Sequence, residues 1–211
     1  MHVNPLTIEP VITAAGWRGG LPLLLGRRLR LREVRRSDAV SLMAMLTSAE
    51  VTRFISAPPT TLDGFERFID WATCQRAAGS HACFVATLVG SETPIGLFQV
   101  TDIQPDLKAA EWGFVLAAPF WGSGLFQEAA RLLLDFAFEI IGVHRLEARA
   151  AVLNGRGNGA LLKIGAVPEG VLRRSFLRHG QRFDQAVYSI FGDAWRVSQG
   201  ALQAASAVSI H

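Results

Sequence analysis

A short glycine loop that runs directly into a helix-forming stretch constrains this chain more than any other part of its sequence. The loop holds Gly122 and Gly124, and residues 125–130 follow it with no proline or turn residue between them. Glycine has no Cβ, so such a loop can bring several backbone N–H groups close to one anion. The first turn of the helix adds unpaired N–H donors and the positive end of the helix dipole. The junction indicates either a phosphate site or plain turn chemistry, and the rest of the chain has to decide between them.

Apolar spacing and turn residues place this loop inside a series of strands and helices. Helices are expected at residues 39–46, 60–79, 126–141 and 158–164, where apolar residues recur three or four apart. Strands are expected at 29–34, 82–89, 94–103, 111–116, 145–152, 171–176 and 183–191. This order predicts an α/β (α+β) fold in which a mixed, largely antiparallel central sheet carries helices on both faces.

Length and composition limit the class of protein. A chain of 211 residues can bury a substantial core, and its evenly spread apolar residues with no long linker indicate one domain with terminal extensions. The net charge is +3, and the basic residues are nearly all arginine, because Lys108 and Lys163 are the only lysines. The densest arginine run, residues 27–36, alternates with Leu29, Leu31 and Val34, which indicates an exposed strand face rather than a nucleic-acid-binding tail.

The cysteines and the amino-terminal region indicate a reduced, cytoplasmic setting. Cys74 and Cys83 form no CxxC motif, and no His/Cys cluster with zinc spacing accompanies them, so no metal site is expected. The apolar run 21–25 is too short to span a bilayer or to form the core of a signal peptide. No membrane association is therefore expected.

Several short pieces, taken together, resemble the GNAT acyltransferase superfamily, and within it the RimJ/RimL-like branch of ribosomal-protein-type N-acetyltransferases. The pieces are residues 29–32, 111–116, 119–124 with 128–129, 144–148, Asn154, 163–166, 169–170 with Arg173, and Asp184 with Tyr188. The resemblance covers roughly residues 28–195, so we expect an acyltransferase domain at 28–195, an irregular extension at 1–27 and a tail at 196–211. It implies a GNAT-like acyl-CoA-binding fold in which two neighbouring strands splay apart.

The resemblance also implies a set of residues that bind acetyl-CoA as cosubstrate. The backbone of Gly122, Ser123, Gly124, Leu125 and Phe126, beside Trp121, would hold its pyrophosphate. Main-chain groups of Phe114 and Leu116 would pair with the pantetheine arm where the strands part. Asn154 would bond the arm near the cysteamine, although an Asx turn before the glycines at 155–159 explains this residue equally well.

Glu111 is the expected catalytic base, because direct transfer of an acyl group needs a proton acceptor close to the attacking amine. A salt-bridged glutamate at a strand end is the competing interpretation of this residue. No general acid is assigned: Gly157 and Leu161 stand where related branches carry a serine and a tyrosine, and Tyr188 lies in a late strand. The bulky Phe126 also departs from the superfamily pattern, and its ring has to point into the core if the phosphate loop is to stay open.

Three classes of function remain open from the sequence. The leading hypothesis is an N-acetyltransferase that acetylates a primary amine, either a protein N-terminus or a small amine, by direct attack on the thioester. The alternative is a non-catalytic domain that binds or senses acyl-CoA, and an arginine-rich nucleic-acid binder is unlikely because no stacking aromatic motif is found. The resemblance places the acceptor pocket among the first two helices, the loop 56–61 and the turn 175–182, and it is compatible with a homodimer.

Overall fold

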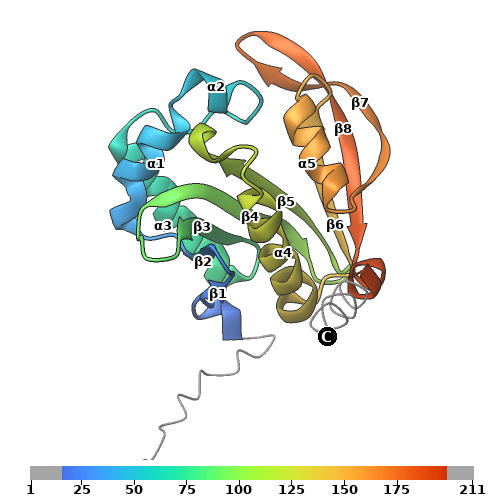
Figure 1. The fold of residues 1–211 in the computed structure, drawn as a ribbon, viewed down its shortest axis with the longest axis horizontal. Helices are drawn as coiled ribbons and strands as arrows, with labels where there is room; N and C mark the ends of the chain where they lie inside the picture. Colours follow the sequence, from blue (N-terminus) through green and yellow to red (C-terminus); the bar gives the residue numbers. More distant parts are fainter. Residues whose placement is uncertain (1–15, 199–211) are drawn as a thin grey trace, which may run out of the picture.

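The computed structural model describes residues 16–198 of the chain, and it has one sheet with helices on both faces (Figure 1). The strands are β1 (Leu24–Leu25), β2 (Leu29–Glu33), β3 (Ala82–Leu88), β4 (Pro94–Gln104), β5 (Ala109–Leu116), β6 (Arg145–Ala151), β7 (Val167–Arg178) and β8 (Gln181–Phe191). Their order in the sheet is β1-β2-β3-β4-β5-β6-β8-β7, and every neighbouring pair is antiparallel except β5 and β6. The predicted mixed, largely antiparallel sheet is thus confirmed.

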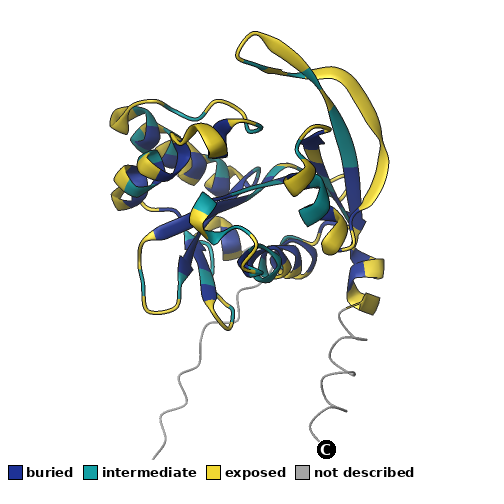
Figure 2. Cartoon of the chain, turned by 45° about the horizontal axis from the view of Figure 1, so that its top comes forward, coloured by how far each residue is buried: buried dark blue, intermediate teal, exposed yellow. Residues whose placement is uncertain are grey.

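The helices cover the sheet from two sides. They are α1 (Ala39–Leu46), α2 (Ala49–Thr52), α3 (Leu62–Ala78), α4 (Leu125–Asp135) with a π-helical continuation at Phe136–Ile141, and α5 (Gly155–Lys163). One core packs α4 and α5 on one face and includes Phe84 and Phe98, and the other packs α1 and α3 on the opposite face and includes Val85 and Leu97. Successive strand residues point to opposite faces, which is why neighbours in β3 and β4 belong to different cores. Figure 2 shows both cores as buried positions along the sheet.

The structure departs from the sequence analysis at three places. Arg32 is not on an exposed face: it is 5% exposed, and its guanidinium makes two 2.8 Å bonds to the buried carboxylate of Asp38. The helix expected at residues 60–79 begins later, at Leu62, because Thr61 caps it with a hydroxyl that accepts the Gly64 N–H. The single turn α2 carries no periodic signal long enough to predict, because four residues span only about one helical turn.

The segment before β2 is tied to the domain. Trp17, in a short 3-10 turn (Gly16–Arg18), is 2% exposed and meets the Phe136 ring edge-on at 6.3 Å between centroids. Leu24 and Leu25 pair with β2 as the strand β1. Residues 1–15 and the tail from residue 199 lie outside the described part of the chain.

Candidate active site

The glycine loop adopts the backbone that only glycine takes easily. Gly122 has φ +73° and Gly124 has φ +80°, both in the left-handed region, and Gly124 is the N-cap of α4. Nothing lies within 4 Å of where a Cβ at Gly122 would be, so its open side faces free space. The Ser123 hydroxyl donates to the Phe120 carbonyl at 2.6 Å, and it accepts the Leu125 N–H at 3.3 Å. The loop is therefore held from within while one side of it stays open.

A clamp from the turn before β2 holds the loop from outside. The Arg28 guanidinium donates to the Ser123 carbonyl at 2.9 Å and to the Glu128 carboxylate, also at 2.9 Å. The same carboxylate accepts the Arg28 backbone N–H at 2.8 Å. Burial acts to raise the pKa of Glu128, but the bonds from Arg28 outweigh it and hold that pKa below the usual range. Glu128 thus stays charged in the first turn of α4, with a side chain only 18% exposed.

Next to the loop, β5 and β6 part. They pair only from Ala109 with Arg145 to Glu111 with Glu147, and beyond that point they diverge. The Ala117 N–H donates to the Ile95 carbonyl at 2.9 Å, which sets the alternation of the β4–β5 ladder. By this alternation the main-chain groups of Phe114 and Leu116 face away from β4 and into the gap. The predicted splayed pair of strands is present, and both residues expected to bind in it point that way.

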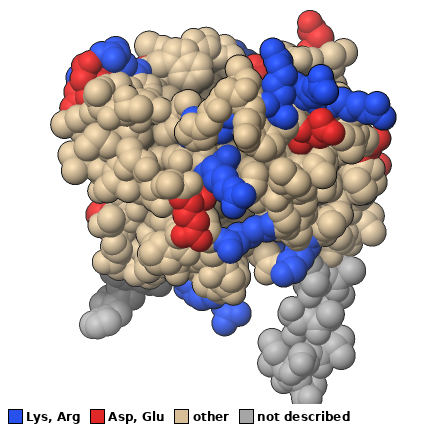
Figure 3. Space-filling view, turned by 90° about the horizontal axis from the view of Figure 1, so that it is seen from above, with Lys and Arg blue, Asp and Glu red and all other residues tan. Residues whose placement is uncertain are grey.

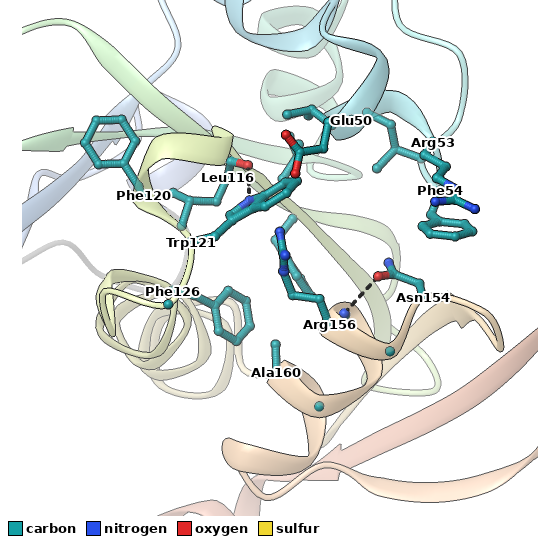
Figure 4. Close-up of a pocket in the computed structure, with 18 of the residues that line it drawn as sticks. Glu50, Arg53, Phe54, Leu116, Phe120, Trp121, Phe126, Asn154, Arg156 and Ala160 are labelled. Atoms are coloured by element: carbon teal, nitrogen blue, oxygen red, sulfur yellow. Dashed lines mark hydrogen bonds between the residues drawn. The ribbon is translucent and has the colours of Figure 1, made fainter.

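A cavity of about 600 Å³ joins the glycine loop to this gap (Figure 4). It has two walls, one from β5, the loop and α4, and the other from α2 and the residues that follow it, with α5 across the gap. Of the predicted cosubstrate-binding residues it is lined by Phe114, Leu116, Trp121, Gly122, Gly124, Phe126 and Asn154. The Leu125 side chain instead lies in the core and Ser123 is exposed, so these two contribute at most their backbones, as expected.

Trp121 and Phe126 shape the wall next to the loop. The Trp121 indole N–H donates to the Leu116 carbonyl at 2.7 Å, which leaves the Leu116 N–H and both groups of Phe114 for a ligand in the gap. The Arg156 guanidinium lies over the Trp121 ring, 3.7 Å from its centroid. The Phe126 ring packs on Phe114 at 4.4 Å between centroids, alongside the core residue Phe98. It therefore lies against the sheet rather than across the phosphate loop.

Asn154 both caps α5 and faces the cavity. Its side-chain oxygen accepts the Gly157 N–H at 3.0 Å, which is the Asx-type role foreseen for it, and its amide lines the cavity. A Cβ on Gly157 would lie 2.5 Å from the Asn154 amide nitrogen, so the amide occupies the space that a serine side chain would need. Leu161 is 1% exposed in the core, and the Tyr188 hydroxyl is bonded to Asn158 at 2.9 Å. None of the three places a free proton donor in the cavity.

Glu111 stands at the apex of the gap but outside the main cavity. It is the last β5 residue paired with β6, and by strand alternation it shares the α1/α3 face of the sheet with Gly113 and Val115. It lines a second cavity of about 500 Å³ and pairs with Arg149 at 2.8 Å. Burial raises the pKa of Glu111, and the Arg149 cation opposes that rise. Nothing lies within 4 Å of a Cβ on Gly113, so the surface between Glu111 and Val115 is open.

Several cavity residues were not foreseen from the sequence. Glu50, Arg53, Phe54 and Ile55 come from α2 and the turn after it, and Arg156 and Lys163 come from α5. Lys163 lies within the helix expected at residues 158–164, whereas Arg156 precedes that range because α5 already begins at Gly155. The α2 residues had no such signal, because their place at the site depends on how the chain crosses the end of the sheet.

Comparison with known proteins identifies the family of proteins to which this chain belongs. Residues 28–167 match the acetyltransferase (GNAT) domain family. The chain belongs to the GNAT acetyltransferase family. It is 26% identical over 172 residues to YoaA of Bacillus subtilis (strain 168), named as an N-acetyltransferase, with 80% of this chain and 96% of that protein covered.

Two further comparisons agree with this membership. The chain is 24% identical over 153 residues to the spermidine N(1)-acetyltransferase of Escherichia coli (strain K12), covering 72% of this chain and 80% of the relative. Its fold matches RimL, a ribosomal L7/L12 alpha-N-protein acetyltransferase solved with coenzyme A, with a TM-score of 0.75 at 16% identity, covering 81% and 98% of the two chains. This GNAT protein is an N-acetyltransferase, and acetyl-CoA is its cosubstrate.

The residues present fit that cosubstrate. The open glycine loop at the start of α4 offers N–H donors to a pyrophosphate, and the gap offers Phe114 and Leu116 to a peptide-like arm. No group of three or more His, Cys, Asp or Glu side chains with the geometry of a metal site occurs within residues 16–198. The helices of that same region include none long and apolar enough to cross a bilayer.

Proposed function

We propose that this GNAT enzyme acetylates the amino terminus of a protein. The observation that carries the proposal is the cavity itself, which runs from the glycine loop through the gap to a second wall at residues 50–55 on the other side (Figure 4). A cosubstrate held at the loop and the gap leaves that second wall for an acceptor. Across the cavity from Phe126, the wall presents Glu50, Arg53 and Phe54.

The composition of this wall favours a protein N-terminus over a polyamine. A polyamine carries several positive charges and needs several carboxylates around it. Of the residues that line the cavity, only Glu50 is acidic, whereas Arg53, Arg156 and Lys163 are basic. A chain that brings one amine and otherwise ordinary peptide groups meets no such repulsion.

Acetyl-CoA supplies the acyl group as a thioester, and the new amide bond forms as the carbon–sulfur bond breaks. The main-chain groups of Phe114 and Leu116 orient the arm that carries it. The amine has to lose a proton, and Glu111 is the base we assign. Val115 lines the main cavity and lies four residues from Glu111, or about 13 Å along the strand. Because of this distance, the proton of the amine reaches Glu111 through water, over the open surface at Gly113.

The test is turnover of acetyl-CoA to free thiol with a panel of acceptors. The panel contains N-terminal peptides, the same peptides with a blocked amino terminus, and spermidine. Release of thiol with free peptides but not with blocked ones supports the proposal. Turnover with spermidine alone would show that the acceptor is a small amine and not a protein N-terminus. Tight acetyl-CoA binding with no turnover on any amine would favour a non-catalytic sensing domain.

A further inference from the structure

The cations of this protein are unevenly neutralised. Away from the cleft, ten of the thirteen arginines are paired with carboxylates, and Arg18, Arg27 and Arg131 are the exceptions within residues 16–198. The ten are Arg28, Arg30, Arg32, Arg35, Arg36, Arg67, Arg76, Arg145, Arg149 and Arg196. Around the mouth of the cleft the arginines are not paired in this way. Within residues 16–198, no carboxylate oxygen lies within 4.0 Å of the guanidinium nitrogens of Arg53, Arg156, Arg173, Arg174, Arg178 or Arg182. In the view onto this end of the molecule, Lys and Arg side chains form a group at the upper right, and others run down the middle of the face (Figure 3).

The cosubstrate accounts for only some of these charges. Arg156 stacks on Trp121 at the glycine loop, and Lys163 lies on α5, which packs beside α4. Both therefore line the part of the cavity next to the glycine loop, where the phosphates would bind. Arg53 projects from the opposite wall, beside Phe54, whose ring centroid is 5.0 Å away. A phosphate at the glycine loop does not explain a cation there.

Arg178 lies beside Arg53, although it is far away in the sequence. Its Nε donates to the Thr52 carbonyl at 3.2 Å, so the tip of the β7–β8 hairpin reaches the residue that precedes Arg53. Figure 1 shows this hairpin leaning over the end of the sheet toward α2. The bond to Thr52 brings two arginines without a carboxylate partner to neighbouring positions on the rim of the cleft, and a bound anion would reduce the repulsion between their charges. We call Arg53 and Arg178 the rim pair.

The hairpin behind the rim pair extends this basic surface. Residues 170–185 contain Arg173, Arg174, Arg178 and Arg182 but only one acidic residue, Asp184. Residues 167–175 of β7 are all exposed, and β7 is an edge strand with no neighbour on its outer side. A surface of this length is larger than a small anion needs, and it suits an extended chain.

We propose that the acceptor is an acidic polypeptide segment, whose carboxylates bind the rim pair and the β7–β8 hairpin while its amino terminus enters the cleft. This inference rests on the proposed function and adds the class of acceptor. It assigns a specificity role to Arg53 and Arg178, which contact the acceptor away from the reacting atoms.

The test compares two peptides of equal length with the same first residues. One carries Asp and Glu at the following positions, and the other carries Asn and Gln there. Binding to the protein loaded with coenzyme A is measured by fluorescence anisotropy, and turnover is measured by thiol release. We expect about tenfold tighter binding and a lower KM for the acidic peptide. Salt raised from about 0.05 to about 0.5 M should remove most of this preference.

Variants locate the effect. Arg178→Gln and Arg53→Gln should each reduce the preference for the acidic peptide, and the pair together should nearly abolish it. Lys108→Gln is the matched control, because Lys108 lies at the far end of β5 from the cleft and should keep the full preference. Unaltered acetyl-CoA affinity in the arginine variants shows that the cosubstrate site is intact.

Two results would overturn the inference and leave the proposed function standing. One is equal binding of the acidic and neutral peptides when peptide turnover is normal. The other is a single-stranded RNA that competes for the hairpin while neither peptide depends on the rim pair. Absence of turnover with every amine would instead count against the proposed function, and peptide binding would still decide the inference.

Discussion

At the scale of single residues, neighbours set the chemistry of the titratable groups more than residue type does. Glu111 and Glu128 are both glutamates in contact with arginine, yet the pKa of Glu111 is raised and that of Glu128 is lowered. Burial raises both, and Glu128 differs because a backbone N–H and a guanidinium both donate to it. The carboxylate beside the phosphate loop is thereby kept charged, and the one at the gap is kept closer to neutrality and thus more basic.

Replacing Glu111 by Gln should lower kcat about 100-fold with little change in acetyl-CoA affinity, because the amine then lacks a proton acceptor. Since the pKa of Glu111 is raised by burial, kcat/KM of the wild type should fall as pH drops through a value above the usual glutamate range. Glu147→Gln is the control, as Glu147 is the cross-strand neighbour that shares Arg149. A pH profile unchanged by Glu111→Gln would show that another group is the base.

His81 should make the stability of the protein depend on pH. It is 4% exposed, its Nε2 has no partner, and burial lowers its pKa from 6.5 to about 4, although a bond to Gln99 opposes this. As pH falls, the imidazole is protonated in the unfolded chain before it is protonated in the folded protein. The free energy of unfolding should therefore be unaffected by this group above about pH 6.5, and it should decrease by about 3 kcal/mol in all as pH falls toward 4. Urea unfolding at several pH values, compared with His81→Gln, should show a smaller slope for the variant. Identical slopes would mean that His81 is accessible to protons.

At the scale of elements, the start of α4 and the start of α5 face each other across the gap. The start of α4 offers main-chain N–H donors from a glycine loop. The start of α5 is capped by Asn154 and projects Arg156 toward Trp121. The two helix starts were both visible in the sequence as glycine and asparagine signals. Their pairing was not, because it follows from the divergence of β5 and β6, which only the register of the sheet shows.

Gly124→Glu should abolish measurable acetyl-CoA binding, because it adds a negative charge to the loop that we propose binds the pyrophosphate. The same substitution at Gly90 is a matched control, since Gly90 also has positive φ, +84°, and sits in the β3–β4 turn. The positive φ should cost both variants a similar amount, about 1–2 kcal/mol. A Cβ at Gly124 would also lie 3.3 Å from the Arg28 Nη2, whereas one at Gly90 would have nothing within 4 Å. Calorimetric titration with acetyl-CoA should therefore separate them. Similar affinity in the two variants would remove the loop from the site.

At the scale of the whole molecule, the segment ahead of β2 acts as part of the core. Trp17 packs edge-on against Phe136, and the turn that follows β1 delivers Arg28 to the phosphate loop. Stability and the shape of the site are therefore linked through the same stretch. The predicted domain start at residue 28 and the end at residue 195 stay predictions, and the buried Trp17 lies outside that start.

Trp17→Ala should destabilise the protein by about 3–5 kcal/mol, because it empties a buried aromatic site. Trp71→Ala is the comparison, since Trp71 is 49% exposed and its loss should cost far less. Denaturant unfolding of the two variants measures the difference. Equal losses would show that the segment carrying Trp17 is only loosely attached to the domain.

Local patterns were enough to predict most of the fold and part of the site. Ala39–Leu46 occurs where its spacing placed it, and the glycine loop opens α4 as expected, because caps, turns and periodicity act over a few residues. Arg32 was misread, because a buried ion pair depends on Asp38 six residues on, and alternation alone does not distinguish it from an exposed strand. The wall at residues 50–55 and the rim pair could not be predicted either, because their positions depend on contacts between segments that lie still further apart in the chain.

The sequence by itself determined that a glycine loop precedes a helix and that strands and helices combine into one mixed sheet with helices on both faces. Only the tertiary structure decided that Arg178 meets Thr52 across 126 residues, and that Glu111 stands apart from the main cavity. Local structure follows from interactions between near neighbours in the chain. The candidate active site is instead formed by segments that are distant in the chain, and its geometry is set by the order and register of the strands in the sheet.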